Sequence, residues 1–509
     1  MMMFKAKKTK STVITGVALG VMALLSGCRV GPKYNPPAPA AITAPSYKES
    51  TLNFHDQEGW KVASPQDAMI RGKWWEIFNE PELNDLEEQL VVNNQNIRAS
   101  FENLMAARAV IAEARAQYWP TITAGASWNR SRSSSNLRNS SQANTGTTST
   151  LWSLPLEVSW TPDFFGKIRN EVHSAEYSAQ VSTADLELEK LVVQASLAQY
   201  FFEIRGQDML QQILNQTVEV DQKALDVTQG AYDSGVGDYI AVVEAKTTLK
   251  SAQSSAINVG LLRAQYEHAI ATLVGKIASD FSIPVKPMLY TPPPIPTGVP
   301  SQLAERRPDI AAAERTLAQA NATIGIGYGA FFPQVTIAAG GGFDSSTFKH
   351  LFDISSRFWS IGPSASQVVF DGGLYRAQLH QYQAIYNTDL ANYRQTVLTA
   401  FQQVEDSLSA TRIYSQQILS QDEAVKAAQQ FLDLEMERYR MGVDPFVTVV
   451  VAQTALLNNQ VTLNTLRVQQ MLSTVQLVQA LGGGWDQSQL PTAKQVGEKV
   501  PSSDYATQK

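Results

Sequence analysis

The sequence is poor in the residues that mark enzymes and metal sites. Only Cys28 of its 509 residues is a cysteine, so no disulfide can form within the chain. The five histidines are scattered and lack the spacing of metal ligands. There is no P-loop and no nucleophile elbow, and after Cys28 there is no run of roughly 18 apolar residues. The sequence therefore predicts no enzyme, no metal, no cofactor and no transmembrane helix.

Charge and glycine content argue against two further kinds of ligand. A formal net charge of -6 gives no reason to expect nucleic acid as a partner. The glycines of residues 325–329 superficially resemble a nucleotide-binding loop, but they precede an expected strand instead of following one. Alanines occupy the matching positions, residues 112–116, of an internal repeat. Close packing of helices explains small residues at both places.

The N-terminus has the pattern of an export signal. A basic stretch precedes the short apolar run from Val13 to Leu25, which is too brief to span a bilayer. The run ends in Leu25-Ser26-Gly27-Cys28, which resembles the lipobox of bacterial lipoproteins. The resemblance implies removal of a signal peptide, residues 1–27, and acylation of the Cys28 thiol. Arg29 follows where many lipoproteins kept at the inner membrane carry aspartate, which favours the outer membrane.

The main pattern is an internal repeat of about two hundred residues. In each half a helical pattern ends at an aromatic-proline break, Tyr118-Trp119-Pro120 in the first and Phe331-Phe332-Pro333 in the second. Each break is followed by an alternating segment, a polar loop and another alternating segment. A long helix, a glycine turn and a further helix come next. Because both halves keep this order, the sequence predicts two copies of one helix-and-hairpin unit.

Proline-rich and polar linkers divide the chain into six segments. Proline excludes helix and central strand from the linker between the repeats. The expected segments are a signal peptide at 1–27, a lipid-anchored tether and equatorial segment at 28–80, repeat 1 at 81–283, a linker at 284–300, repeat 2 at 301–485 and a polar, mobile tail at 486–509.

Apolar residues have coiled-coil spacing on both sides of the first glycine turn. The stripe before the turn comprises Leu210, Ile213, Thr217, Val220, Ala224, Val227 and Ala231, and the stripe after it comprises Ala245, Leu249, Ala252, Ala256 and Val259. The two helices are therefore expected to pack antiparallel. The first, from about Phe164 to Tyr232, would span on the order of 100 Å, far more than a bilayer core.

Four segments alternate between apolar and polar residues, about 121–130, 151–162, 334–343 and 359–370. Some ten residues of alternation with tryptophan at the margins is typical of a transmembrane β-strand. Four strands cannot close a barrel and open edges are not tolerated in lipid, so several chains must share one barrel. Three chains give about twelve strands, within the known range. The polar stretches Asn129 to Thr150 and Asp344 to Arg357 are expected to be exterior loops.

At this point the residues resemble a known family. The lipobox followed by Val30-Gly31-Pro32-Lys33-Tyr34, the Trp74-Trp75 and Phe78 cluster before Pro81-Glu82-Leu83, and two Tyr-x-x-Gly-Val turns are similar to outer-membrane efflux lipoproteins of the NodT-type, OprM-like branch of the TolC superfamily. The resemblance implies a mainly α, TolC-like fold with a transmembrane β part. In that fold a homotrimer forms a twelve-stranded β-barrel on a twelve-helix α-barrel.

The same resemblance implies a function and partners. The trimer would be a passive exit duct for small molecules, embedded in the lipid bilayer of the outer membrane. A periplasmic adaptor, or membrane fusion protein, would connect it to a proton-driven inner-membrane pump of the resistance-nodulation-division (RND) type.

The two glycine turns are the expected adaptor contact, because the resemblance implies that they form the periplasmic mouth. Glycine permits the left-handed residue that closes a helix, and aspartate supplies the N-cap of the next one. The predicted contact residues are Tyr232, Gly235, Gly237, Asp238 and Tyr239 at the first turn, and Tyr439, Arg440, Gly442, Asp444, Pro445 and Phe446 at the second.

The helix after the second turn is the expected gate. In relatives it carries a leucine and then an aspartate that narrow the closed mouth, with an arginine nearby. The matching positions here are Val447, Val451 and Thr454, so the last two depart from the family pattern. The sequence therefore predicts a mainly apolar constriction at Val447 and Val451. Glu244, which matches Val451 one repeat earlier, is the alternative carboxylate.

Two other functions are compatible with these patterns. A TolC-like exit channel of a type I protein secretion system would keep the fold and change the partner, and co-purification would distinguish the two. A lipid-anchored coiled-coil protein without a pore, serving as a spacer or adhesin, would give no conductance in planar bilayers and no heat-resistant trimer.

Overall fold

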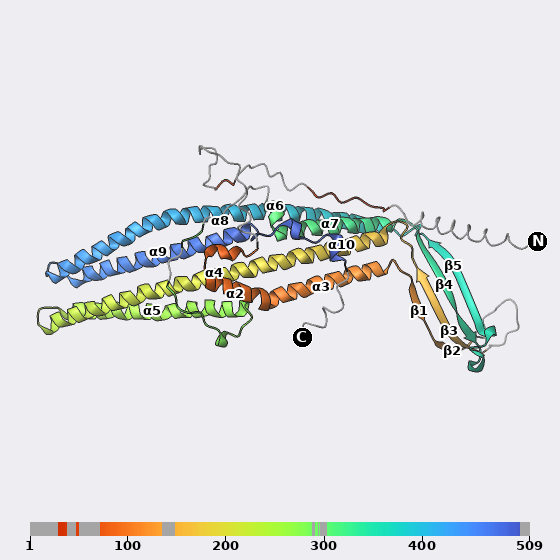
Figure 1. Ribbon diagram of the computed structural model, residues 1–509, viewed down its shortest axis with the longest axis horizontal. Helices are drawn as coiled ribbons and strands as arrows, with labels where there is room; N and C mark the ends of the chain where they lie inside the picture. Colours follow the sequence, from red (N-terminus) through yellow and green to blue (C-terminus); the bar gives the residue numbers. More distant parts are fainter. Residues whose placement is uncertain are drawn as a thin grey trace, which may run out of the picture.

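The long helices run side by side along one axis, and a sheet extends from one end of them (Figure 1). This computed structural model describes residues 29–37, 47–49, 72–134, 148–287, 291–293, 295 and 303–498. Cys28, most of the proline-rich linker and part of the first exterior loop lie outside the described residues.

Helices of the two halves match in length. α3 (Gln95–Ala116) and α7 (Pro308–Gly329) have 22 residues each, α4 (Lys167–Asp233) and α8 (Leu374–Arg440) have 67 each, and α5 (Tyr239–Leu273) and α9 (Phe446–Ala480) have 35 each. A helix of 67 residues is about 100 Å long. The shorter elements are η2 (Trp74–Phe78), α2 (Pro81–Asn93), η3 (Ala278–Asp280), α6 (Leu303–Arg306), η5 (Phe348–His350), η6 (Ile354–Ser356), η7 (Gln487–Gln489) and α10 (Ala493–Val496).

Each long helix packs against the helix that follows its glycine turn, α4 with α5 and α8 with α9. α9 also lies along α4, which joins the two halves (Figure 1). Among the described helices α9 alone is long and apolar enough to cross a membrane, by length and composition only. It packs against both α8 and α4, which leaves 33% of its most apolar stretch buried within the chain.

The predicted stripe of α5 is confirmed at Ala245, Leu249, Ala252 and Val259, which are all buried. The stripe predicted on α4 is partly wrong. Of the predicted stripe only Ala224 is buried, and Val220 and Val227 are more than a third exposed. The other buried residues of 210–231 are Leu214, Asp221 and Thr228. The reason is that α4 packs against α9 as well as α5, so its buried face turns toward both neighbours.

A band of aromatic side chains forms the core where α2, α3, α4, α5 and α9 meet. Trp74 and Phe78 pack against Phe201 and Phe202 of α4, and the rings of Phe78 and Phe202 lie 5.0 Å apart. An ion network lies beside this core. Asp208 accepts bonds from Arg205 at 3.0 Å and Arg263 at 2.7 Å, and Arg205 also pairs with Glu82. Because Arg205 and Arg263 bond Pro284 O and Ile283 O, the network holds the start of the inter-repeat linker.

The sheet is antiparallel, with the order β1 and β2, then β3, β4 and β5. The strands are β1 (Thr121–Ala124), β2 (Ser127–Arg132), β3 (Thr148–Trp160), β4 (Gln334–Ser345) and β5 (Arg357–Ser366). The single strand predicted at 121–130 is therefore interrupted at residues 125 and 126. There Gly125 N still donates to Pro155 O at 2.9 Å, but Pro155 has no N–H to return to the ladder.

Register places apolar residues on one face of this sheet. Trp152, Leu154, Leu156, Val158 and Trp160 alternate with polar residues along β3, and their partners on the neighbouring strands are mostly apolar. Neither β1 and β2 nor β5 has a partner on its outer side among the described residues, so the sheet has two open edges. An isolated subunit would expose both edges, which lipid does not tolerate.

The first described residues form a strap along the body. Arg29 Nε donates to Asn170 Oδ1 at 2.6 Å, and Val30 N donates to Phe165 O at 3.2 Å. Further along, Asn321 Nδ2 donates to Pro32 O, and the Tyr34 hydroxyl donates to Glu314 at 2.5 Å. The strap therefore ties α4 to α7 close to the sheet.

The segment after residue 485 corrects the expectation of a mobile tail. Val496 of α10 is completely buried against Ile111, Ala175 and Ala179. Gly497 O accepts a bond from Arg115 at 2.6 Å. Leu490 also packs against the body, and Gln180 donates to Pro491 O at 2.9 Å. A few such contacts dock a polar segment, so composition alone misjudged residues 486–498.

Candidate functional site

The first tip turn is closed by glycine at two positions. Gly235 has φ of +73°, the left-handed conformation that ends a helix, and Val236 and Gly237 both donate to Ala231 O. A Cβ on Gly237 would lie 2.9 Å from the Cβ of Ala231. Asp238 then caps α5 as predicted, accepting from Ile240 N at 3.1 Å. The conformation of the turn therefore follows from local glycine and capping interactions.

The second tip turn repeats this geometry with different chemistry. Gly442 has φ of +74°, and Val443 N donates to Arg438 O at 2.9 Å. The predicted capping role of Asp444 is wrong, because Pro445 occupies the N-cap and no side-chain cap bond forms. Asp444 pairs with Arg438 instead, and the guanidinium lowers the pKa of that carboxyl.

An aromatic pair supports each turn. The rings of Tyr232 and Tyr239 lie 5.2 Å apart, and so do those of Tyr439 and Phe446. Phe446 is buried in a small core with Ala224, Ala245 and Val449, which belong to α4, α5 and α9. Burial raises the pKa of Tyr439. The helices next to both turns therefore share this one small hydrophobic core.

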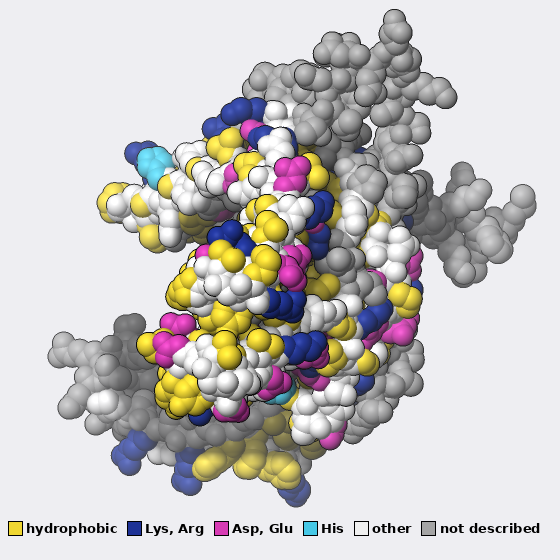
Figure 2. Space-filling view, turned by 90° about the vertical axis from the view of Figure 1, so that its left-hand side faces the viewer, with side chains coloured by type: hydrophobic (Ala, Val, Ile, Leu, Met, Phe, Trp, Pro, Cys, Tyr) yellow, Lys and Arg dark blue, Asp and Glu magenta, His cyan; other side chains and the backbone are white. Residues whose placement is uncertain are grey.

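A groove of about 530 Å³ lies between the two turns. Figure 2 views this end of the molecule, where apolar and charged side chains are mixed. The structure thus brings together most of the predicted tip residues and both kinds of predicted gate residue; those that line the groove are Gly237, Asp238, Glu244, Tyr439, Arg440, Gly442, Asp444, Pro445, Phe446 and Val447. Tyr232, Gly235, Tyr239 and Val451 lie outside its lining.

The predicted gate valines share one face of α9, since Val447 and Val451 are one helical turn apart. Within one subunit they are 46% and 57% exposed, so they are free to face other chains. Glu244 is half-buried on α5, facing the groove. The valines and the carboxylate therefore belong to different helices of the same tip.

A buried acid near the tips was not predicted from the sequence. Asp221 of α4 is 2% exposed, neither carboxylate oxygen has a hydrogen-bond partner, and burial raises its pKa to about 6. Gln453 of α9 is also buried with its Nε2 unpartnered. α4 and α9 run antiparallel and are in contact at Gly206 and Val468. Asp221 and Gln453 lie the same number of residues nearer to the tip than this contact, so they are at the same level along the two helices. Leu214, Asp221 and Thr228 are spaced seven residues apart, and this heptad spacing is the sequence pattern that could have indicated burial of Asp221.

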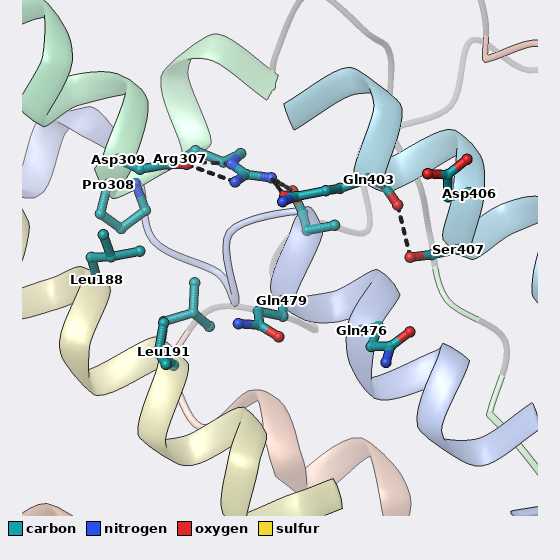
Figure 3. A pocket seen from close by; sticks show the side chains of 12 residues that line it. Leu188, Leu191, Arg307, Pro308, Asp309, Gln403, Asp406, Ser407, Gln476 and Gln479 are labelled. Carbon is teal, nitrogen blue, oxygen red and sulfur yellow. Dashed lines mark hydrogen bonds and ion pairs between the residues drawn. The ribbon is translucent and has the colours of Figure 1, made fainter. Parts of the chain in front are cut away.

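A second cavity, of about 480 Å³, lies between α4, α7, α8 and α9 (Figure 3). Arg307 reaches across its wall and donates to Asp309, to Gln403 at 2.8 Å and to Ala480 O at 3.0 Å. Leu188 and Leu191 of α4 form the opposite side. The Arg307 guanidinium therefore has its hydrogen-bond partners within the protein. The cavity lies where the two repeats pack together, α4 belonging to the first and α7, α8 and α9 to the second.

These features define a class of protein. A sheet with one apolar face and two open edges is a fraction of a membrane barrel, and helices about 100 Å long continue it outside the bilayer. The two tip turns, with a groove between them, lie at the far end. These are the features of a membrane channel with a long helical extension.

Comparison with known proteins identifies the family. The sequence profile described as "Outer membrane efflux protein" matches residues 86–276 and 299–483, one segment for each repeat. The chain belongs to this family of outer-membrane efflux channels, and it is an outer-membrane exit duct of an efflux system. The predicted family and function are therefore confirmed.

Individual relatives can be aligned with nearly the whole chain. The antibiotic efflux pump outer membrane protein ArpC of Pseudomonas putida is 30% identical over 95% of this chain and 99% of its own length. OprJ of Pseudomonas aeruginosa is 28% identical over 92% and 97%. Among solved structures, the outer-membrane channel OprN matches with a TM-score of 0.80 at 27% identity, over 90% of this chain and all of its own. The Campylobacter jejuni channel CmeC, at 21% identity, also gives 0.80, over 94% and 100%, and so supports the fold. The predicted TolC-like fold is confirmed.

Proposed function

We propose that three copies of this chain form a passive duct that carries small molecules from a tripartite pump assembly to the cell exterior. The observation that carries this proposal is the sheet with two open edges and one apolar face, because only association with other copies removes those edges in lipid. Three copies of four strands' width give a barrel of ordinary size. The duct performs no chemistry, and energy comes from the pump.

Conductance and heat resistance test the duct. The purified protein should migrate as a trimer in sodium dodecyl sulfate until it is heated, and should give steady channels in planar bilayers. A protein that stays monomeric in mild detergent and leaves liposomes sealed to small solutes would contradict the proposal.

We place the adaptor contact in the groove between the tip turns. Its walls present apolar side chains next to Arg440, Asp444 and Glu244, a mixture suited to a helical hairpin that is itself amphipathic. A photo-crosslinking residue at Arg440 should capture the periplasmic adaptor in intact cells. The same residue at Lys276, near the equatorial end of α5, is the control and should capture none.

The gate is placed at Val447 and Val451 of α9. Their exposed faces would meet their counterparts from the other two copies around the axis of the mouth. Val447→Ala removes two methyl groups from each of three chains and should raise single-channel conductance. The matched change Val110→Ala, on the exposed side of α3, should leave conductance unchanged. Equal conductance in both variants would remove the gate from Val447.

The lipid anchor is placed on Cys28. The strap that begins at Arg29 docks beside the sheet, so acyl chains on Cys28 would enter the membrane without further chain length. Mass spectrometry of the N-terminal peptide should detect acylated cysteine, and Cys28→Ser should lack the added mass. An unmodified thiol in the mature wild-type protein would contradict this assignment.

A further inference from the structure

The lipid-facing side of the sheet changes character at its outer end. Residues of even number on β2 and β3 form the apolar face, and Trp128 lies opposite Trp152 with ring centroids 5.8 Å apart. Outward of this aromatic row the same face of β2 continues with Arg130 and Arg132, whose cross-strand partners are Thr150 and Thr148. The hairpins at this end lie away from the helices (Figure 1), so it is the end at the cell exterior.

The other edge of the sheet repeats the arrangement. Arg357 opens β5, and Trp359 follows two residues later on the same face with 81% of its surface exposed. The guanidinium of Arg357 lies 5.8 Å from the centroid of the Phe343 ring, a cation–π contact through the face of the guanidinium that does not use its N–H groups. Each edge strand thus carries arginine just outward of an exposed tryptophan. Since strands rise about 3.3 Å per residue, the arginines begin about 7 Å beyond the tryptophans.

No acidic side chain accompanies these arginines on the lipid-facing side of the strands, within 121–134, 148–160, 334–345 and 357–366. The nearest acids in register, Asp344 and Glu157, belong to the opposite face, where Asp344 accepts a bond from Ser153 at 2.6 Å. No protein partner is recorded for the guanidinium of Arg130 or Arg132 among the described residues. All three arginines are exposed.

Closure of the trimeric barrel proposed above, on which this inference rests, concentrates this charge. The outer edge of β5 in one copy must pair with the β1 and β2 edge of the next copy, because no other edge is available. Arg357 of one subunit therefore comes to the same seam as Arg130 and Arg132 of its neighbour. Three like charges at a subunit seam repel one another unless an anion lies between them. The aromatic row fixes their height at the membrane interface, since tryptophan concentrates there.

We propose that each seam binds a phosphate-bearing glycolipid of the outer leaflet, with Arg130 and Arg132 of one subunit and Arg357 of the next holding its phosphate groups. Guanidinium binds phosphate through paired, charge-assisted hydrogen bonds, and the exposed tryptophans and aliphatic residues below receive the acyl chains. A free phosphate ion could use only the charges, whereas a lipid uses the charges and the apolar face together. The bound lipid bridges two copies and so stabilises the trimer.

The test uses the full-length trimer in detergent and two synthetic glycolipids that differ only in phosphate. Native mass spectrometry should find about three molecules of the bisphosphorylated glycolipid retained per trimer, one for each seam. Retention of the form without phosphates should be roughly tenfold weaker or more. Phosphorylated lipid should also raise the temperature at which the trimer dissociates.

Three triple variants complete the experiment. Changing Arg130, Arg132 and Arg357 to serine should abolish the preference for phosphate and the rise in dissociation temperature, while the lysine triple variant keeps part of both. The serine triple variant should still form trimers, which gel migration checks. A matched serine triple at Arg98, Lys223 and Lys250, all exposed on periplasmic helices, should behave as wild type. Equal retention of the two glycolipids by wild type, or an unchanged preference in the serine triple at the seam, would overturn the proposal.

Discussion

Replacing Asp221 by asparagine is expected to stabilise the tips above pH 6. Ionising this carboxyl leaves a charge in a site that is 2% exposed and provides no hydrogen-bond partner, which is why burial raises its pKa from 3.8 to about 6. A shift of about two units corresponds to at most about 3 kcal/mol in each chain. Asparagine resembles the neutral acid in shape and carries no charge to bury.

The direction of the pH dependence follows from proton binding. Between about pH 4 and pH 6 the folded tip keeps the proton that the unfolded chain loses, so stability falls as pH rises through this window. Above pH 6 the loss is complete. The Asp221→Asn variant should lack this fall and should therefore be more stable than wild type at pH 7.5, with little difference below pH 4.

Hydrogen exchange of the α4 amides around residue 221, measured by mass spectrometry at several pH values, reports the free energy of local opening. The control is Asp226→Asn on the same helix, where an exposed carboxylate accepts from Gln222 at 2.9 Å. That variant should keep the wild-type pH dependence. If the Asp221→Asn variant has the same free energy of local opening as wild type at pH 7.5, ionisation of the buried carboxyl costs no stability and the reasoning fails.

Three further changes probe the turns and the core. Gly237→Ala should cost about 1–2 kcal/mol by overpacking against Ala231, seen as a lower melting temperature by circular dichroism. Gly230→Ala, where an added Cβ meets nothing within 4 Å, should not lower it, and equal losses would contradict the contact. Arg205→Met should cost about 1.5–3 kcal/mol, measured by trimer dissociation, because it removes the buried bond to Asp208, which keeps Arg263, and the pairing with Glu82; exposed Arg98→Met should be neutral. Arg438→Gln should speed hydrogen exchange at Val443 near pH 7. Because the pKa of Asp444 is lowered, wild type should lose this protection only as pH falls below about 4, and an unchanged rate in the variant would count against the ion pair.

The larger plan of the molecule could be predicted because the chain repeats it. Two aromatic-proline breaks, two hairpins and two glycine turns kept the same order, and this order outweighs weak signals in each strand. Equal lengths of 67 residues in α4 and α8 show how closely the copies agree. Solvent exposure of the tips was also predictable, because glycine and aspartate mark turns by their local chemistry.

Details that depend on a third element could not be predicted. Val220 and Val227 fit the α4 stripe until α9 packs on that helix and turns its buried face toward Asp221. Asp444 is a good capping residue by type, yet Arg438 on the previous helix captures it. Pro155 interrupts the neighbouring strand across the sheet, which no pattern within 121–130 records. In each case a contact distant in sequence outweighed a local preference.

The two open sheet edges also have a genetic consequence. If the barrel is the proposed trimer, a cell that makes normal and defective copies in equal amounts will assemble only about one barrel in eight from normal copies alone, provided that the copies mix freely. A mutation that blocks the periplasmic mouth but still allows assembly should therefore be dominant. A plasmid carrying it should make cells more sensitive to the exported compounds, even when they keep an intact chromosomal gene.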